Sequence, residues 1–477
     1  MSIHNFPRFT AAIIALLACM TGVIAHAQGG QHRMALALLS TLANCTTASD
    51  RPQLAVLLNG DNLLVANNDG LGSELCFSFK PCMQNKLMTF SHVGVREVER
   101  TTSQPADIFR DSNMKWLNVA TSDNIGPVGV KGYSNFVGGN HLWHSSDSTG
   151  QKGTGPKTEV MTAKCDSFAI YADGKRLLSN QSTSCRKVTV EVWNTLFDPL
   201  IDPAEGATSL SSPLIIEHAT YTLEDNSIAV VLEHQYLKSF TVSRYYGMQS
   251  MFVGENVILT PNGPYIKWIS QGSIKNFSKK KFPWFSHFAE RAPGGWCQTT
   301  WLMDDDLGAH GCLQDDSPIF SRASNKCYHV LMDNWPVEAG ESHRWQGVYV
   351  WSRPLIDDDF LTITKGVFHG RTLLIVDAKQ AGTCTIDRPA WWTEFYRSVT
   401  SHNLDFVVTD NLITITADKA TSSILLEIEE LDAVDDVQSD VPCHRRDEWY
   451  TLQGQRIAPP SQPGIYLHNS SKVLINR

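Results

Sequence analysis

The chain has 477 residues, of which 42% are hydrophobic and 19% are charged, and its formal net charge is −9. This is the composition of a globular protein that is long enough for two or three domains with sizeable cores. The acidic balance gives no indication of a nucleic-acid partner, and the short run Lys279 to Lys281 is interpreted as a solvated loop.

The first 27 residues have the pattern of a secretory signal peptide. Arg8 supplies the positive charge, an apolar segment follows, and Ala25-His26-Ala27 is a small-x-small cleavage site. One alternative stays open, because Leu16 to Cys19 fits a loose lipobox that would make Cys19 a lipidated N-terminus. In both cases we expect an exported protein in the periplasm, on the cell surface or outside the cell, with peripheral association with the cell envelope.

The cysteines suggest a disulfide framework. Eleven are present, and ten remain if Cys19 leaves with the signal peptide. An even number in an exported protein permits disulfides, and the spacing suggests local pairs. Plausible local partners are Cys76/Cys82, Cys165/Cys185 and Cys297/Cys312, although the sequence alone does not define the connectivity. A zinc site is the weaker alternative, since neither Cys-x-x-Cys nor His-Glu-x-x-His occurs, and no metal or other cofactor is predicted.

After a polar lead-in over residues 28–50, short apolar runs alternate with turns rich in Gly, Asn, Asp and Pro. No long amphipathic helix is convincing. The sequence therefore predicts an all-β protein. We expect a large antiparallel β-sandwich over residues 51–400, with 51–130 and 131–400 as candidate subdomains, and a small C-terminal β domain over 401–477.

Residues 213–246 contain two copies of Glu-His, Glu217-His218 and Glu233-His234. If Asp225-Asn226 is a two-residue hairpin turn, Glu217 faces His234 and His218 faces Glu233 across the strands. The first pair would share its face with apolar residues. An ionisable pair on such a face is costly unless its members satisfy each other, so it is either a structural lock or a functional acid–base pair.

The next strand carries Arg244, Tyr245 and Tyr246. An arginine can bind a uronate carboxylate through two hydrogen bonds, and a tyrosine can act as an acid, although core packing is the alternative for both tyrosines. The predicted catalytic residues are His234, Glu217, Arg244, Tyr246 and His141.

The segment Gly138 to His144 brings two histidines and a tryptophan onto a loop or strand end. Its histidines are candidate metal ligands, loop-stabilising groups or sugar contacts. Tryptophans over 284–301 offer stacking surfaces for a sugar, or else core packing. The predicted substrate-binding residues are Asn140, His144, Trp143, His218, Glu233 and Trp296.

The C-terminal tail follows an acidic linker over residues 429–440. It contains Tyr-x-Leu-x-Gly-x-Arg over 450–456, Gly-Ile-Tyr over 464–466 and a final Lys-Val strand from Lys472. This pattern resembles the end of the C-terminal sorting domains of type IX secretion in Bacteroidetes-type Gram-negative bacteria. The resemblance covers about 30 residues and implies a surface or periplasmic setting.

The middle of the chain, residues 130–351, resembles secreted β-sandwich proteins of the galactose-mutarotase-like superfamily, which includes parts of polysaccharide lyases and glycosidases. The features in common are Gly-Gly-Asn-His over 138–141, the Asp173-Gly174 turn, the Glu/His hairpin, and the run from Ala339 to Tyr349 with its Trp345 and Gly347. The resemblance implies a carbohydrate ligand and assigns no role to an individual residue.

Two functions are therefore expected. The first is an exported carbohydrate-active enzyme, a polysaccharide lyase or hydrolase that uses His/Tyr/Arg acid–base chemistry on a polysaccharide or other glycan. The alternative is a non-catalytic surface β-sandwich that binds a glycan or a host protein. Convergence of His141, Glu217, His234 and Arg244 on one concave surface would favour the enzyme, whereas enclosure of His234 by apolar residues would favour the lock.

Overall fold

The computed structural model describes residues 54–68, 73–97, 115–118, 124–144, 159–251, 256–260, 263–265, 283–289, 295–303, 322–323, 326–328, 331–389, 392, 396–398, 403–427, 449–450, 456–457, 464–468 and 471–475. The chain divides into two compact units, Met1–Glu427 and Ile428–Arg477, and each is described by itself. The predicted signal peptide and lead-in lie outside the described residues.

The first unit is built on a ten-stranded antiparallel sheet. In spatial order its strands are β11 (Lys175–Arg176), β10 (Ala163–Ala172), β13 (Lys187–Phe197), β14 (Pro213–Glu224), β15 (Ser227–Tyr236), β25 (Ser342–Ser352), β21 (Cys297–Met303), β20 (Trp284–Ala289), β18 (Asn256–Thr260) and β19 (Gly263–Tyr265). Buried residues alternate with more exposed ones along β13 and β14, as the two-residue period of a strand requires. One side of the sheet is therefore a core face, and we call the other its open face.

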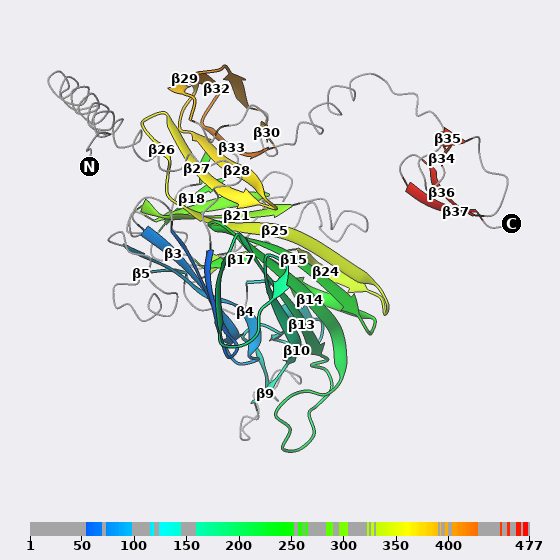
Figure 1. Cartoon of the computed structure of the whole chain (residues 1–477). Coiled ribbons are helices and arrows are strands. Elements are labelled where there is room, and N and C mark those ends of the chain that lie inside the picture. Colours follow the sequence, from blue (N-terminus) through cyan, green and yellow to red (C-terminus); the bar gives the residue numbers. More distant parts are fainter. Residues whose placement is uncertain are drawn as a thin grey trace, which may run out of the picture. The chain divides into compact units, whose positions relative to one another are not determined.

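Two smaller sheets cover the core face (Figure 1). The six-stranded sheet consists of β12 (Gln181–Cys185), β1 (Leu54–Asn59), β2 (Asn62–Asn68), β3 (Ser73–Cys82), β4 (Leu87–Glu97) and β5 (Lys115–Asn118). The four-stranded sheet consists of β24 (Met332–Val337), β16 (Phe240–Tyr245), β6 (Val128–Val130) and β7 (Phe136–Val137). Residues of all three sheets share one buried apolar cluster, in which the Tyr221 ring meets Phe79 and Phe90 edge to face, with centroids 5.4 and 6.1 Å apart.

A second, smaller sandwich follows in the chain. Its larger sheet consists of β26 (Ile356–Asp357), β27 (Leu361–Phe368), β28 (Arg371–Ala378), β33 (Thr421–Glu427) and β30 (Tyr396–Ser398), and its smaller sheet of β29 (Gly382–Asp387), β32 (Leu412–Ala417) and β31 (Leu404–Val408). The two sheets enclose an apolar cluster of their own, and the larger one also packs on part of the open face. Because β33 pairs with β28, the first unit extends past residue 400, where we had expected the C-terminal domain to begin.

Three minor sheets complete the described structure. The first unit also contains β17 (Gln249–Met251) with β23 (Lys326–Tyr328) and β22 (Arg322–Ala323), and β8 (Leu142–His144) with β9 (Glu159–Met161). The second unit is an antiparallel sheet of β35 (Arg456–Ile457), β34 (Trp449–Tyr450), β36 (Gly464–His468) and β37 (Ser471–Ile475). A sorting role for this unit stays a prediction.

The all-β sandwich predicted from the sequence is confirmed. Within the described ranges there is no α-helix. A search of the same ranges finds no helix with the length and apolar character needed to cross a membrane.

The predicted register of the Glu/His hairpin is also confirmed. Glu224 pairs with Ser227 around the Asp225-Asn226 turn, and Asp225 takes a left-handed φ of 52°. Short polar residues such as Asp tolerate this conformation better than branched ones. The two Glu-His copies therefore face each other across β14 and β15 as expected.

The predicted disulfides Cys76/Cys82 and Cys165/Cys185 are wrong, because all four residues carry free thiols. Cys76 and Cys82 lie on the single strand β3, and six residues of extended chain span about 20 Å, far beyond the reach of a disulfide. Burial raises the pKa of Cys82 to about 11 and that of Cys185 to about 12, so neither thiol is reactive near neutral pH. Cys297 is likewise a free thiol, and Cys312 lies outside the described residues.

Candidate functional site

The Glu217–His234 pair lies on the core face of the ten-stranded sheet. His234 Nε2 is 2.9 Å from Glu217 Oε2, and Asn194 Nδ2 donates to the other carboxylate oxygen at 2.8 Å. Glu217 and His234 are each 2% exposed. A substrate on the surface cannot touch these atoms, so the predicted catalytic role of both residues is replaced by that of an interior lock, in which each polar group satisfies the other.

The Glu217–His234 pair also contacts strand β16 on its buried side. The His234 ring lies 5.0 Å from that of Tyr245, whose hydroxyl donates to Ile125 O at 2.7 Å and accepts from Trp345 Nε1 at 2.8 Å. Burial raises the pKa of Tyr245 well above its ordinary value of 10.0, so this hydroxyl keeps its proton. Tyr245 is thus a core residue, which was one of the two alternatives for the tyrosine pair.

The neighbours of Tyr245 face the other way. Successive side chains of a strand point to opposite sides, so Arg244 and Tyr246 lie on the outer side of β16, and both are half-exposed. The Tyr246 ring contacts the Phe136 ring with centroids 5.5 Å apart, and Phe136 contacts His141 at 5.2 Å. The guanidinium of Arg244 lies 6.0 Å from the Tyr246 centroid. We call Phe136, His141, Arg244 and Tyr246 the His141 cluster.

The hydrogen bonds of His141 determine where its ring carries a lone pair. Its Nδ1 is 3.0 Å from Asn135 Oδ1, and the amide orientation of Asn135 is supported by Nδ2 donating to Leu142 O at 3.4 Å. An amide oxygen only accepts, so Nδ1 is the donor and the neutral ring has its lone pair at Nε2. An imidazole held in one tautomer by its second nitrogen is the usual arrangement of a general base.

Two buried residues, Asn85 and Thr162, hold the loop that carries His141, and we call them the Asn85 hub. Asn85 Nδ2 donates to Gly139 O at 3.0 Å and to His141 O at 2.9 Å, while Asn85 Oδ1 accepts from the backbone of Thr162 at 2.9 Å. Thr162 Oγ1 also donates to His141 O at 2.6 Å. Gly138 and Gly139 take left-handed φ values of 80° and 50°, which a glycine adopts without penalty. Sequence reasoning found the loop but missed Asn85, which no local pattern distinguishes from an ordinary turn asparagine.

Arg244 keeps its positive charge in this setting. Burial works against the charged form, but a hydrogen bond to Tyr246 and the carboxylate of Asp333 outweigh it, and together they raise the pKa of Arg244. Asp333 accepts from Nη2 at 3.4 Å, at the long end of the hydrogen-bond range. A guanidinium has five donors, so this contact leaves most of them for other partners.

Two tryptophans that were predicted to bind substrate are core residues. Trp143 is 3% exposed and donates from Nε1 to Pro199 O at 3.0 Å. Trp296 is also 3% exposed, and Arg353 covers its ring at 5.7 Å. Neither face is open to a sugar, so the predicted substrate-binding role of both residues is wrong on the ground of burial.

The histidine segment shows no metal site in the structure. Asn140 is exposed next to His141, and His144 is half-buried with Nδ1 3.8 Å from the Glu159 carboxylate. No group of three or more potential ligands occurs anywhere in the part of the chain that the structure describes. Of the alternatives for this segment, loop stabilisation by the Asn135 bond and contact with a ligand both remain compatible with the geometry.

The second Glu-His pair lies on the open face. The His218 ring stacks on Trp193 with centroids 4.8 Å apart and planes 7° apart, and Glu233 is exposed opposite Arg344 of β25. His218 and Glu233 therefore lie on a surface, whereas Glu217 and His234 do not. His141, Glu217, His234 and Arg244 therefore do not converge on one concave surface. His141 and Arg244 lie on the outer surface, whereas Glu217 and His234 are buried beneath it.

No family model matches the chain, and no curated protein matches it either. Among solved structures, the chain is similar to an α-galactosidase from Geobacillus stearothermophilus in complex with stachyose, with 12% sequence identity and a TM-score of 0.30 over 63% of this chain and 40% of that one. It is also similar to a galactose 1-epimerase from Lactobacillus acidophilus, with 10% identity and a TM-score of 0.27 over 63% of this chain and 99% of that one. A chondroitin AC lyase from Streptomyces coelicolor in complex with chondroitin sulphate has 10% identity and a TM-score of 0.15 over 76% and 49% of the two chains.

These structural neighbours are carbohydrate-active galactosidase, epimerase and lyase domains. The chain spans less than half the length of the galactosidase and of the lyase. At such TM-scores the likeness carries no argument about this chain's activity, so any functional conclusion has to come from its own residues.

Proposed function

We propose that the chain is a carbohydrate-active enzyme that cleaves a uronate-containing polysaccharide by β-elimination at the His141 cluster. The observation that carries this proposal is a continuous set of contacts on the outer side of β16 and β7. The Phe136 ring meets both His141 and Tyr246, and Arg244 lies over the Tyr246 ring. These are the imidazole, the phenol and the guanidinium that acid–base chemistry next to a carboxylate requires.

Each residue has a defined part in the proposed reaction. Arg244 binds the uronate carboxylate and offsets the negative charge that develops when the neighbouring carbon loses its proton. His141 Nε2 takes that proton, the bond from the adjacent carbon to the glycosidic oxygen breaks, and a carbon–carbon double bond forms. Tyr246 donates its hydroxyl proton to the leaving oxygen, and exchange with water then restores both side chains.

Elimination fits this cluster better than hydrolysis does. Glycoside hydrolysis ordinarily uses two carboxyl groups on opposite sides of the scissile bond. Asp333 contacts the cluster through Arg244, which holds it. A neutral imidazole and a phenol, in contrast, supply a base and an acid without a second carboxylate.

The test is a turnover screen of the purified full-length protein on polysaccharides with and without uronate residues. Elimination produces an unsaturated uronate that absorbs in the ultraviolet, whereas hydrolysis releases reducing ends without that absorbance. We expect His141→Ala and Tyr246→Phe to lower turnover by about 10²–10⁴-fold. The control is His369→Ala, which removes an exposed histidine outside the cluster and should change turnover less than about twofold.

Turnover that is unchanged in folded His141→Ala would remove this residue from the mechanism. Reducing ends without ultraviolet absorbance would replace elimination by hydrolysis. Binding of a glycan without any turnover would favour the non-catalytic alternative.

The proposal also includes export to the periplasm or cell surface, which rests on the N-terminal pattern ending at Ala27. Mass spectrometry of the mature N-terminus tests it directly. A chain beginning at Gln28 supports ordinary cleavage, one beginning at a lipidated Cys19 supports the lipobox alternative, and retention of the first residues contradicts export by this route.

A further inference from the structure

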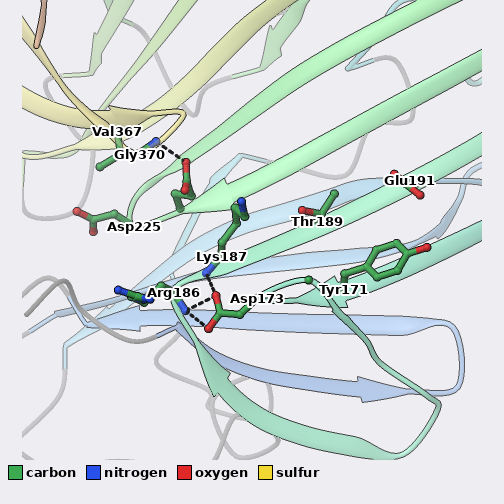
Figure 2. A pocket seen from close by; sticks show the side chains of 11 residues that line it. Tyr171, Asp173, Arg186, Lys187, Thr189, Glu191, Asp225, Val367 and Gly370 are labelled. Carbon is green, nitrogen blue, oxygen red and sulfur yellow. Dashed lines mark hydrogen bonds between the residues drawn. The ribbon is translucent and has the colours of Figure 1, made fainter. Parts of the chain in front are cut away.

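A groove on the open face of the ten-stranded sheet has no part in the reaction proposed for the His141 cluster. Its volume is about 770 Å³, within the roughly 300–1,000 Å³ that small-ligand sites usually have. Figure 2 shows that β10 and β13 form its floor, and that the β14–β15 turn and the end of the β27–β28 hairpin form its wall. No local sequence pattern indicates this groove, because its residues come from four separate segments.

One set of its polar groups builds the groove. The Asp173 carboxylate accepts from the backbone N–H groups of Arg186 and Lys187 at 3.1 and 3.0 Å, and fixes the turn at one end (Figure 2). Glu224 Oε2 accepts from Gly370 N at 2.9 Å, and Asp225 Oδ1 accepts from Asn67 Nδ2 at 2.6 Å. These carboxylates are committed to the protein's own backbone and side chains.

Further hydrogen bonds join the two parts of the wall to each other and to β25. Asn226 Nδ2 donates to Trp351 O and to Lys365 O, both at 2.8 Å. The Ser227 hydroxyl accepts from Val367 N at 2.9 Å. The groove is therefore preformed, and a ligand would not have to order its walls on binding.

A second set of polar groups faces the groove without a structural task. Tyr171 and Thr189 are cross-strand neighbours on β10 and β13, and Glu191 lies two residues further along β13, opposite the small Ala169 (Figure 2). All three lining side chains are half-buried. Among the described residues, none makes a hydrogen bond or ion pair with the Tyr171 hydroxyl, the Thr189 hydroxyl or the Glu191 carboxylate. A half-buried aromatic ring beside such acceptors and donors suits a sugar, which offers an apolar ring face and hydroxyl edges.

The net charge of the residues that line the groove favours neutral sugars over acidic ones. Four carboxylates line the groove, from Asp173, Glu191, Glu224 and Asp225, against the two cations Arg186 and Lys187. This negative excess repels a polyanion, so a uronate chain fits poorly. The same excess does not penalise a neutral glycan, whose hydroxyls donate well to a carboxylate.

We infer that this groove is a second carbohydrate site, which binds a neutral oligosaccharide through stacking on Tyr171 and hydroxyl contacts with Glu191 and Thr189. The groove lies on the open face of the large sheet, whereas the His141 cluster lies on the outer side of the sheet that covers its core face. The inference therefore does not depend on the proposed elimination.

The test is isothermal titration of the full-length protein with neutral oligosaccharides of galactose, mannose, glucose and xylose, and with an oligouronate of equal length. We expect binding of at least one neutral oligosaccharide and no binding of the oligouronate to the groove. Glu191→Gln should weaken neutral binding at least about tenfold, since a hydrogen bond to a charged group is lost. Tyr171→Ala should weaken it by a similar factor.

Two controls separate this site from the His141 cluster. Glu205→Gln removes an exposed carboxylate outside the groove and should bind like the wild type. His141→Ala should also retain neutral binding, even if it loses turnover. Absence of neutral binding at millimolar concentration would overturn the inference, and so would neutral binding that persists in both groove variants. An oligouronate that binds the groove more tightly than any neutral oligosaccharide, and more tightly still in Glu191→Gln, would also overturn it.

Discussion

The two Glu-His copies of the hairpin share a sequence, a strand pair and a register, yet the fold uses them differently. On the core face, Glu217 and His234 are enclosed and bonded to each other, and Asn194 completes the set. On the open face, Glu233 is exposed and His218 stacks on Trp193. The difference arises from strand parity alone, because adjacent residues of a strand point to opposite faces.

The comparison shows why a charge pair on an apolar face is a poor guide to catalysis. Removing a carboxylate and an imidazole from water is costly, and only good geometry offsets that cost. The pair that meets this condition does so by closing itself off from any substrate. The catalytic candidates lie instead on the outer side of β16, one residue on either side of the Tyr245 that contacts the lock.

The largest effect that would test this comparison is on stability. Glu217→Ala should lower the free energy of unfolding by about 3–5 kcal/mol, because it leaves His234 and Asn194 buried without their partner. Glu233→Ala, the matched change on the open face, should cost no more than about 0.5 kcal/mol. Urea denaturation of both variants measures the two values. Equal losses would contradict the assignment of one pair to the core and the other to the surface.

A smaller effect is expected at the Asn85 hub below the His141 loop. Asn85→Ala should cost about 2–3 kcal/mol, since it leaves buried carbonyl and N–H groups of the loop without partners. It should also lower turnover, because His141 O is one of the groups that Asn85 holds. Gln235→Ala, which removes an exposed amide on β15, is the control and should change neither quantity. Loss of stability without any loss of turnover would separate the loop from the chemistry.

The smallest effect concerns Asp377, a buried carboxylate on which burial outweighs the opposing influences of Ser422 and Lys379. Burial raises the pKa of Asp377 above its ordinary value of 3.8, although Ser422 Oγ donates to it at 2.8 Å. The folded chain therefore holds this proton more tightly than the unfolded chain does, and the group's contribution to stability falls as the pH rises through the folded pKa.

Asp377→Asn removes that penalty and keeps an oxygen acceptor for Ser422. The variant should equal the wild type in stability below pH 3.8 and exceed it slightly at neutral pH, with the gap opening as the pH rises. Urea denaturation across this range measures the gap. A gap that opens in the acidic direction instead would mean that the fold favours the ionised carboxylate.

The sequence predicted what depends on local patterns. Alternating apolar residues and turn chemistry gave the all-β class, and the Asp225-Asn226 turn alone set a register that places Glu217 opposite His234. The glycines at 138 and 139 marked the loop that presents His141. Local patterns also located Arg244 and Tyr246 on the adjacent strand.

What the sequence could not predict depends on contacts between distant segments. Trp143 and Trp296 are buried, and each contacts a residue far away in the chain, Pro199 for the first and Arg353 for the second. Asn85 acts on a loop more than 50 residues away. The groove beside Tyr171 is closed by the β27–β28 hairpin. The proposed Cys76/Cys82 disulfide failed because one strand holds its two members apart.

The most direct test of the account is turnover of a uronate polysaccharide by two histidine variants, each measured on protein shown to be folded. His141→Ala should lose turnover by about 10²–10⁴-fold and recover part of it when free imidazole is added, because the added base takes the place of the missing side chain. His234→Gln, on the core face, should lose stability and keep turnover within about tenfold of the wild type. The opposite result would be full turnover in His141→Ala and a loss of turnover in His234→Gln that free imidazole restores. It would contradict the proposed role of His141 and place the chemistry at the buried Glu217–His234 pair.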